Sequence, residues 1–160
     1  MCARDAAADR IDPVLRAAEV EDLPRLWELD RICFEPGIAY SRRELRRFLA
    51  LPGAQGIVAE VGGRLAGFSL GYPDRADAAA RVVTLDVHPD FRRRRLGRRL
   101  LGDLLERLAG AGCVRSLLEV DVRNSGAIAF YRREGFREIG RIPSYYGRGL
   151  DAFEMEKALS

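Results

Sequence analysis

The spacing of hydrophobic residues in the first third of the chain changes from a strand pattern to a helix pattern. Residues 14–18 are predicted to form a strand. The apolar residues that follow recur every three or four positions and predict one face of a helix: Leu23, Leu26, Trp27, Leu29 and Ile32. A second helix is expected to begin after Ser41 and to end near Leu49, because Ser41 and Glu44 have the spacing of a capping box.

Strand and helix patterns then alternate to the C-terminus. A hairpin is predicted around Gly62-Gly63, between the strands 56–61 and 65–72. The later elements are predicted to be a strand at 81–88, a helix at 95–109, a strand at 114–122, a helix from Asn124-Ser125 to Arg133, and strands at 136–141 and 152–157. The expected fold class is α/β, with a mixed central sheet of about seven strands, helices on both faces, and the order βααβββαβαββ. Strands 81–88 and 114–122 should be parallel, joined by a right-handed crossover.

Length and composition set the broad class. The chain has 160 residues, 48% of them hydrophobic and 32% charged, which is typical of a globular protein. We expect one domain at 14–160 after a disordered leader at 1–13. Because no apolar run is long enough to cross a bilayer, we expect a cytoplasmic protein that does not bind membranes. The cysteines, Cys2, Cys33 and Cys113, match no metal-binding pattern, so no metal is expected.

The segment Thr84–Leu101 carries the strongest functional signal. A strand ends at Val87-His88-Pro89, an arginine-rich turn follows, and a helix begins. Free backbone N–H groups in such a turn, together with the positive end of the helix dipole, bind phosphate groups. The sequence therefore predicts a ligand that carries a pyrophosphate. The net charge of +3 is too small to indicate nucleic acid by itself.

These elements resemble the GNAT superfamily of acetyl-CoA-dependent N-acetyltransferases over residues 14–158. The motif of that family, Arg/Gln-x-x-Gly-x-Gly/Ala, corresponds here to Arg92-Arg93-Arg94-Arg95-Leu96-Gly97. Two further stretches, Leu118–Phe136 and Ile142–Leu159, resemble the RimI-type group, which acetylates the N-terminal amine of a small-subunit ribosomal protein. The resemblance implies acetyl-CoA as co-substrate and, as acceptor partner, a protein N-terminus such as that of a ribosomal protein.

The resemblance also implies roles for individual residues. Glu119 corresponds to the general base and Tyr131 to the general acid, which would also contact the cofactor. Asn124 would cap a helix and contact the pantetheine arm of acetyl-CoA. The remaining residues expected to bind the cofactor are Leu85, Asp86, Val87, Arg92, Arg93, Arg94, Arg95, Leu96, Gly97 and Arg98. Without the resemblance, the favoured interpretation of Glu119 and Tyr131 is an ordinary strand charge and a packing aromatic.

Arg95 departs from the motif, which has glycine at this position. Because arginine carries a Cβ, the turn is expected to keep a right-handed conformation there and to direct the side chain outward. His88, the only histidine, is expected to be a turn residue and not a catalyst. Asp86 and Asp121 are expected to provide an acidic lining near the amine.

Phe34, Tyr40, Tyr145 and Tyr146 fall in the segments that bind peptide in the family, so they are the expected acceptor-binding residues. Two alternatives to an N-terminal acetyltransferase remain. The acceptor could be a small-molecule amine or a protein lysine. The chain could instead be an acetyl-CoA sensor without catalysis or a basic module that binds nucleic acid. The presence of both Glu119 and Tyr131 argues against the sensor, and nucleic acid is not expected because no known nucleic-acid-binding motif is present.

Overall fold

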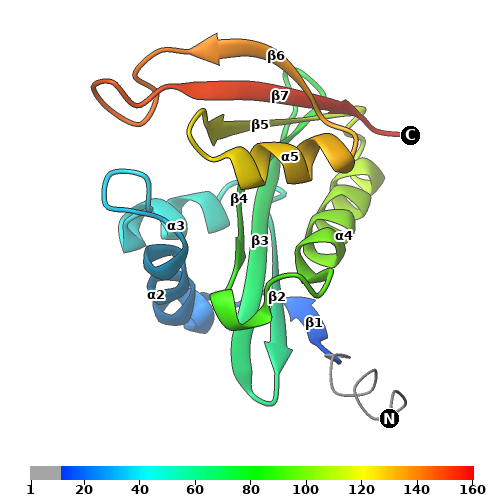
Figure 1. The fold of residues 1–160 in the computed structure, drawn as a ribbon. Coiled ribbons are helices and arrows are strands. Elements are labelled where there is room, and N and C mark those ends of the chain that lie inside the picture. The colour runs from blue at the N-terminus through cyan, green and yellow to red at the C-terminus, as the bar shows by residue number, and fades with distance from the viewer. Residues whose placement is uncertain (1–11) are drawn as a thin grey trace, which may run out of the picture.

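The computed structural model describes residues 12–160 and shows a central sheet with helices on both faces (Figure 1). Of the predicted leader at 1–13, residues 1–11 lie outside the described part, and Pro13 is buried beside the first strand. The first half comprises β1 (Val14–Ala17), a short 3-10 turn (Val20–Asp22), α2 (Leu23–Cys33), α3 (Arg42–Leu49), β2 (Gln55–Val61) and β3 (Arg64–Asp74). The second half comprises β4 (Ala79–Val87), a 3-10 turn (Pro89–Phe91), α4 (Leu96–Gly110), β5 (Arg115–Asp121), α5 (Ser125–Arg133), β6 (Arg137–Ile142) and β7 (Ala152–Ala158).

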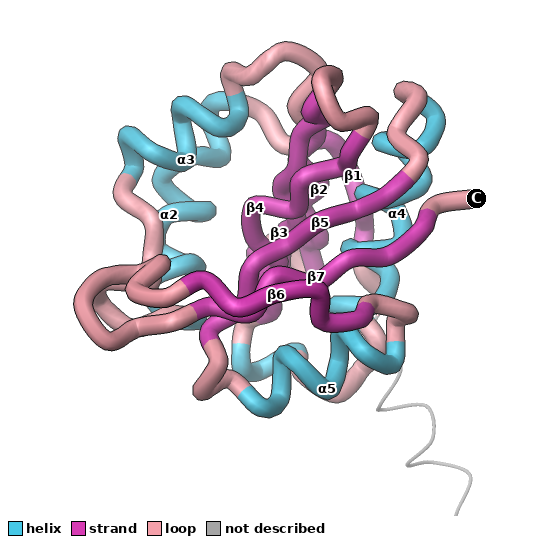
Figure 2. Tube along the Cα trace, turned by 90° about the horizontal axis from the view of Figure 1, so that it is seen from above, coloured by secondary structure: helices cyan, strands magenta, loops and turns pink. Residues whose placement is uncertain are grey.

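The sheet confirms the predicted α/β class and the order of elements. Its seven strands lie in the order β1-β2-β3-β4-β5-β7-β6, and every neighbouring pair is antiparallel except β4 and β5. The view from above in Figure 2 shows the helices on either side of this sheet. In residues 12–160, no helix combines the length and the apolar character needed to cross a membrane.

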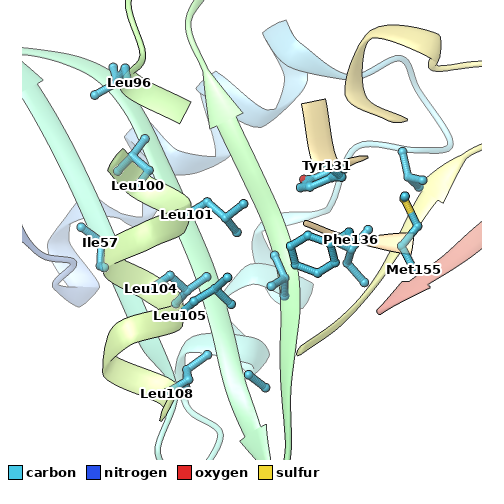
Figure 3. Packing of buried hydrophobic residues seen from close by; sticks show 14 of the residues in the cluster. Ile57, Leu96, Leu100, Leu101, Leu104, Leu105, Leu108, Tyr131, Phe136 and Met155 are labelled. Atoms are coloured by element: carbon cyan, nitrogen blue, oxygen red, sulfur yellow. The ribbon is translucent and has the colours of Figure 1, made fainter. Parts of the chain in front are cut away.

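Helix α4 and the C-terminal helix α5 cover one face of the sheet. The predicted leucine stripe of α4 is confirmed, because all its members are at most 6% exposed: Leu96, Leu100, Leu101, Leu104, Leu105 and Leu108. Figure 3 shows these leucines packing against Ile57, while Tyr131, Phe136 and Met155 continue the same core under α5. Gly67 in β3 allows this close approach, since a Cβ there would lie 2.9 Å from a methyl carbon of Leu100 and 2.6 Å from the Asp86 carbonyl oxygen.

Helices α2 and α3 cover the other face. Their buried residues pack on side chains of β2 and β3 in a second core: Leu23, Leu26, Leu29, Leu45, Val58, Phe68 and Leu70. The predicted capping box at the start of α3 is confirmed, because the Glu44 backbone N–H donates to Ser41 Oγ (3.1 Å) and the Ser41 N–H donates to Glu44 Oε2 (2.8 Å). This cap fixes where the α2–α3 connection ends.

Strands β4 and β5 diverge, and this divergence creates room for a site. They pair only where Ala79–Arg81 lie beside Arg115–Leu117. Beyond this short ladder β4 runs on to Val87 and β5 to Asp121, and no pairing between them is found in the described residues. Side chains from both faces of the sheet can therefore meet in the gap.

Candidate functional site

Two adjoining cavities occupy the gap between β4 and β5. One has a volume of about 380 Å³ and lies toward α2 and the β6–β7 connection. The other has a volume of about 840 Å³ and lies between the Val87–Arg98 segment and α5. They share six wall residues: Cys33, Phe34, Leu85, Asn124, Ala127 and Tyr131. We call the larger space the cradle and the smaller one the acceptor cavity.

The cradle brings together most of the residues that the sequence assigns to the cofactor. Its walls include Leu85, Val87, Arg92, Arg93, Arg95, Leu96, Gly97, Arg98, Asn124 and Tyr131. Arg94 is exposed and lies outside the walls of both cavities. A Cβ on Gly97 would meet Val87 and Phe130 only at ordinary contact distances, 3.6 Å and 3.7 Å, so this position accepts glycine or alanine as the motif requires.

The turn that opens α4 does not keep a right-handed conformation, and that prediction is wrong. Arg95, the residue before α4, has φ +61° and ψ +13°, and Arg93 has φ +62°. The backbone thus adopts at Arg95 the left-handed conformation that the motif glycine would supply, despite the Cβ. A non-glycine residue pays about 1–2 kcal/mol for this conformation, so the fold retains the turn geometry at a cost in strain.

Successive residues of β4 direct their backbone N–H and C=O groups alternately toward β3 and into the gap. The His88 N–H donates to the Ala66 carbonyl of β3 (2.8 Å), so Asp86, two residues earlier, also directs its backbone toward β3, where it pairs with Phe68. Leu85 and Val87 lie between these positions and direct their N–H and C=O groups into the gap. Asp86 therefore does not offer its backbone to a ligand in the gap.

The Asp86 side chain does not line the site either, so the prediction that it does is wrong. Asp86 is fully buried, with 0% exposure, and belongs to the wall of neither cavity. Its Oδ1 accepts a hydrogen bond from Thr84 Oγ1 (2.5 Å), and the equally buried Asp30 is close by. Burial and the neighbouring carboxyl raise the pKa of Asp86 far above its usual range. The pair joins β4 to α2 and is part of the core.

The Val87 carbonyl already has partners within the protein. It accepts from Arg92 Nε (3.0 Å) and from Cys33 Sγ (3.5 Å). Arg92 is therefore folded back against the end of β4. Cys33, which sequence analysis treated as incidental, lies at the junction of the two cavities. Burial raises the pKa of its thiol to about 12, so it is a neutral donor at physiological pH.

Glu119 lies in the wall of the acceptor cavity, and its side chain is 19% exposed. Burial raises the pKa of Glu119, and the cross-strand neighbour Glu154 acts in the same direction. Arg81, whose Nη1 is 3.9 Å from Glu119 Oε1, opposes this shift, as does the hydroxyl of Tyr145. A carboxylate with a raised pKa is a stronger base for an amine proton than an exposed one.

Tyr131 is on α5 and lies in the walls of both cavities. Its ring packs edge-on against Phe130 and Phe136, and burial raises the pKa of its hydroxyl, so the phenol stays protonated. Glu119 and Tyr131 thus approach the gap from opposite faces of the sheet. Asn124 lies between the cavities and caps α5, because its Oδ1 accepts from the Ala127 N–H (3.1 Å).

The four residues expected to bind the acceptor all lie in the wall of the acceptor cavity: Phe34, Tyr40, Tyr145 and Tyr146. Tyr40 is fixed by its backbone N–H, which donates to Asp30 Oδ2 (2.7 Å). The Tyr145–Tyr146 loop is fixed by Asp151, which accepts from the Ser144 N–H (2.8 Å) and from Arg141 Nη2 (2.9 Å). Two aspartates therefore hold the two aromatic walls in place.

Sequence analysis missed a charged group at the mouth of this cavity. Arg123 pairs with Asp121 (2.7 Å) and with Glu35 of the α2–α3 connection. Asp121 lines the acceptor cavity as expected, but Arg123 balances its charge. Glu35 and Arg123 are far apart in the sequence, and no local pattern joins them. His88 lies in the wall of neither cavity, and its Nδ1 accepts from the Asp90 N–H (3.1 Å), as expected of a turn residue.

Comparison with known proteins identifies the family. The model of the Acetyltransferase (GNAT) family matches residues 23–136. The chain belongs to this family. It is therefore an acyltransferase, and acetyl-CoA is its co-substrate. Within residues 12–160, no three histidine, cysteine or acidic side chains are grouped so that they could hold a metal ion.

One relative matches along almost its whole length. The N-alpha-acetyltransferase RimI of Mycobacterium tuberculosis is 33% identical over 155 residues, which cover 94% of this chain and 95% of that protein. An uncharacterized protein of Mycobacterium leprae, ML0378, is 48% identical over 77 residues, but this match covers 48% of this chain and only 21% of that protein.

Solved structures show the same fold. The ribosomal-protein-S18-alanine N-acetyltransferase of Escherichia coli superposes with a TM-score of 0.81 at 25% identity, covering 93% of this chain and 95% of that one. An acetyltransferase of Salmonella typhimurium solved with acetyl-CoA superposes with a TM-score of 0.76 at 20% identity, covering 93% and 95%. The second likeness concerns the fold alone.

Proposed function

We propose that this GNAT enzyme acetylates the N-terminal α-amine of a protein, by direct transfer from acetyl-CoA. The observation that carries the proposal is the junction of two cavities of different character at Tyr131. One cavity has the free arginines and helix N-terminus that suit a pyrophosphate, and the other has aromatic walls and a carboxylate of raised pKa. The full-length similarity to a protein named N-alpha-acetyltransferase RimI supports the same acceptor class.

The cradle residues would hold the co-substrate. The backbone N–H groups around Arg95–Gly97 and the dipole of α4 would bind the pyrophosphate, with Arg92, Arg93 and Arg98 nearby. The free backbone groups of Leu85 would pair with the pantetheine arm as another strand would, and Asn124 would donate to the same arm. The Val87 N–H, which points into the gap, would polarise the thioester carbonyl.

The chemistry needs one proton removed and one proton supplied. The amine nitrogen attacks the thioester carbonyl carbon, the C–N bond forms, and the C–S bond breaks. Glu119, directly or through water, accepts the proton that the amine loses. Tyr131 donates its hydroxyl proton to the departing thiolate. Because an α-amine has a pKa of about 8, against about 10.4 for lysine, a carboxylate of raised pKa suits an N-terminus better than a lysine.

The charges around the acceptor cavity favour a peptide over a polycation. Arg123 balances Asp121 and Glu35, and Arg81 lies beside Glu119, so the described residues form no deep acidic cup. Tyr40, Tyr145 and Tyr146 instead supply flat apolar surfaces with polar edges, which suit a peptide chain. A protein lysine or a small-molecule amine remains the alternative acceptor.

Acetylation of matched peptides tests the proposal. One set would carry a free N-terminus without lysine, and the other an acetylated N-terminus with one internal lysine. We expect the free N-terminal set to react with the higher kcat/KM, and mass spectrometry of fragments would locate the acetyl group. Equal or faster reaction of the lysine set, or of a polyamine, would assign the enzyme to the alternative.

A further inference from the structure

Arginines without a carboxylate partner gather in two places in the described residues. Elsewhere arginine is usually paired: Arg16, Arg25, Arg64, Arg81, Arg98, Arg115, Arg123, Arg132, Arg137 and Arg141 all form ion pairs. One unpaired group lies at or beside the cradle: Arg92, Arg93, Arg94, Arg95, Arg99 and Arg133. The other lies on α2 and α3: Arg31, Arg42, Arg43, Arg46 and Arg47. The remainder are scattered: Arg75, Arg107 and Arg148.

The geometry of α3 places its four arginines on one face. Leu45 is fully buried, and Phe48 and Leu49 are partly buried on the same side of the helix. At 3.6 residues per turn, Arg43 and Arg47 project from the opposite side, Arg46 lies beside them, and Arg42 borders the buried side next to α2; all four are exposed. The only carboxylate of α3, Glu44, lies at the flank and accepts the Ser41 N–H in the capping box. This face is therefore uniformly positive.

Trp27 links Arg31 of α2 to this face of α3. The guanidinium carbon of Arg42 lies 4.4 Å from the centre of the Trp27 ring, and that of Arg31 lies 4.6 Å from it. Such contacts hold both guanidinium groups in place without neutralising them. We call Arg31, Arg42, Arg43, Arg46 and Arg47 the α2–α3 arginine surface. Of the carboxylates nearest to this surface in sequence, Asp30 is buried and Glu44 is in the capping box, and the exposed Glu28 of α2 forms no ion pair with a described residue.

We propose that the α2–α3 arginine surface binds the phosphate backbone of a nucleic acid beside the acceptor cavity. Planar guanidinium groups bind phosphates in a bidentate manner. The exposed face of α3 has no apolar residue, and no α3 residue lines either cavity, so the surface lacks the apolar pockets that anchor a docked peptide or protein. Contact with a phosphate backbone needs only charge and hydrogen-bond donors.

The position of the surface gives it a role in the choice of acceptor. The connection between α2 and α3 supplies Phe34, Glu35 and Tyr40 to the acceptor cavity and leads directly into α3. A nucleic acid bound on α3 would bring a protein N-terminus held in the same particle close to the cavity and raise its effective concentration. The sequence did not indicate this, because Arg31 and residues 42–47 become one surface only when α2 and α3 pack together.

Titration with nucleic acid tests the binding. A fluorescent RNA hairpin and a DNA duplex of matched length would be added to the full chain, with saturating CoA present to occupy the cradle. We expect micromolar binding at low salt that weakens as salt rises from about 50 to about 200 mM. The variant Arg43→Glu/Arg47→Glu should lose most of the affinity, and its salt slope should fall by about two. Unchanged binding by this variant would overturn the proposal.

Two controls distinguish recognition of phosphate by this surface from a general attraction between opposite charges. Arg75→Glu/Arg107→Glu makes the same change in net charge at scattered unpaired arginines and should bind as the wild type does. Polyglutamate should compete weakly against the RNA. Equal loss in the scattered variant, or equal competition by polyglutamate, would show that charge alone is responsible and would overturn the proposal. Circular dichroism and melting curves would check that both variants are folded.

A tethered acceptor tests the functional consequence, which rests on the proposed N-terminal acetylation. A peptide acceptor joined to the RNA hairpin should show a lower KM than the free peptide in the wild type, and this advantage should be absent in Arg43→Glu/Arg47→Glu. The same variant should acetylate the free peptide normally, because neither residue lines a cavity. If the wild type acetylates no peptide, the proposed function fails, while the RNA titration still tests the surface. An equal KM for tethered and free peptide would contradict the acceptor role.

Discussion

The cradle and the acceptor cavity differ in how the chain builds them. One continuous segment from Val87 to Arg98 makes one wall of the cradle, and α5 with its flanking residues makes the other. The acceptor cavity draws its walls from the α2–α3 connection, β4, β5, α5 and the β6–β7 connection. Local sequence therefore specifies the cradle, whereas the acceptor cavity exists only when the whole sheet has formed.

The two cavities also differ in whether their arginines are paired with carboxylates. Arg92, Arg93 and Arg95 of the cradle have no carboxylate partner in the described residues. At the acceptor cavity, Arg123 in the wall lies against Asp121 and Glu35, and Arg81 outside the wall lies 3.9 Å from Glu119. Unpaired positive charge suits a ligand that brings its own negative charge. The paired charges at the acceptor cavity suit an amine, which must lose its own positive charge before it reacts. Mutations in the acceptor cavity should therefore change catalysis, and those in the cradle should change co-substrate affinity.

Glu119→Gln should have the largest effect in either cavity. Loss of a general base typically costs about 10²–10⁴-fold in rate. Because its pKa is raised, Glu119 is ionised only above that raised value, so the rate of the wild type should rise with pH through it. In the variant only spontaneously deprotonated amine reacts, so the defect should be large just above that pKa, where Glu119 is ionised and most of the amine is still protonated, and it should shrink toward alkaline pH. The measurement is kcat/KM against pH.

A neighbouring carboxylate provides the control for Glu119. Glu154 lies opposite Glu119 on β7 but does not line the acceptor cavity. Glu154→Gln should keep nearly full activity, and the pH at which its rate rises should move slightly lower, because a negative neighbour has been removed from Glu119. A rate for Glu119→Gln within about twofold of the wild type at every pH would exclude the base role.

Tyr131→Phe should have the second-largest effect on catalysis. The variant keeps the ring contacts with Phe130 and Phe136 but cannot protonate the thiolate. We expect kcat to fall by about 10² or more, while the dissociation constant of acetyl-CoA, measured by calorimetry, stays the same. Tyr72→Phe, on a tyrosine outside both cavities, is the control and should leave kcat unchanged. A loss of acetyl-CoA affinity equal to the loss of rate would mean that Tyr131 binds the co-substrate and does not act as an acid.

The difference between the cavities also explains what the sequence could predict. The leucine spacing of α4 and the capping box of α3 are local patterns, and both elements form as expected. The same holds for the order of elements along the chain and for the parallel pairing of β4 with β5. The cradle is built from these same local elements, so the wall from Val87 to Arg98 could largely be predicted, whereas α5 residues such as Phe130 and Arg133 were missed.

The errors occur where tertiary structure decides. Asp86 was expected to line the site, but the register of β4 with β3 buries it beside Asp30. The pairing of Arg123 with Glu35 depends on two distant connections meeting across the gap. Arg95 was expected to avoid a left-handed conformation, but its φ is +61° where the turn joins α4. Residue preferences predict these positions poorly, because neighbours far along the chain outweigh them.

Asp151→Ala should have an intermediate effect, confined to the acceptor side. Asp151 holds Ser144, whose φ is +54°, and so sets the loop that places Tyr145 beside Glu119. We expect the KM for a peptide acceptor to rise several-fold while the KM for acetyl-CoA is unchanged. Asp151→Asn, which keeps an oxygen acceptor for Ser144, should restore part of the loss. Asp90→Ala removes an exposed aspartate that pairs with Arg64, and it should change neither KM. An equal rise in both KM values would show a general loss of structure.

Arg95→Gly should have the smallest effect, and it tests whether the cradle depends on backbone shape or on the side chain. Glycine removes about 1–2 kcal/mol of left-handed strain, but it adds about 0.5–1 kcal/mol of chain entropy to the unfolded state. The net gain in stability should therefore be about 1 kcal/mol or less, and urea unfolding can measure it. The pyrophosphate should still find the same backbone N–H groups, so the affinity for acetyl-CoA should be equal or higher. Arg93→Gly, which relieves the same conformation at a position where the motif does not require glycine, is the matched control. A marked loss of affinity in Arg95→Gly alone would mean that the Arg95 guanidinium group itself binds the phosphates, and that this chain replaces the close backbone approach allowed by glycine with a direct ionic contact.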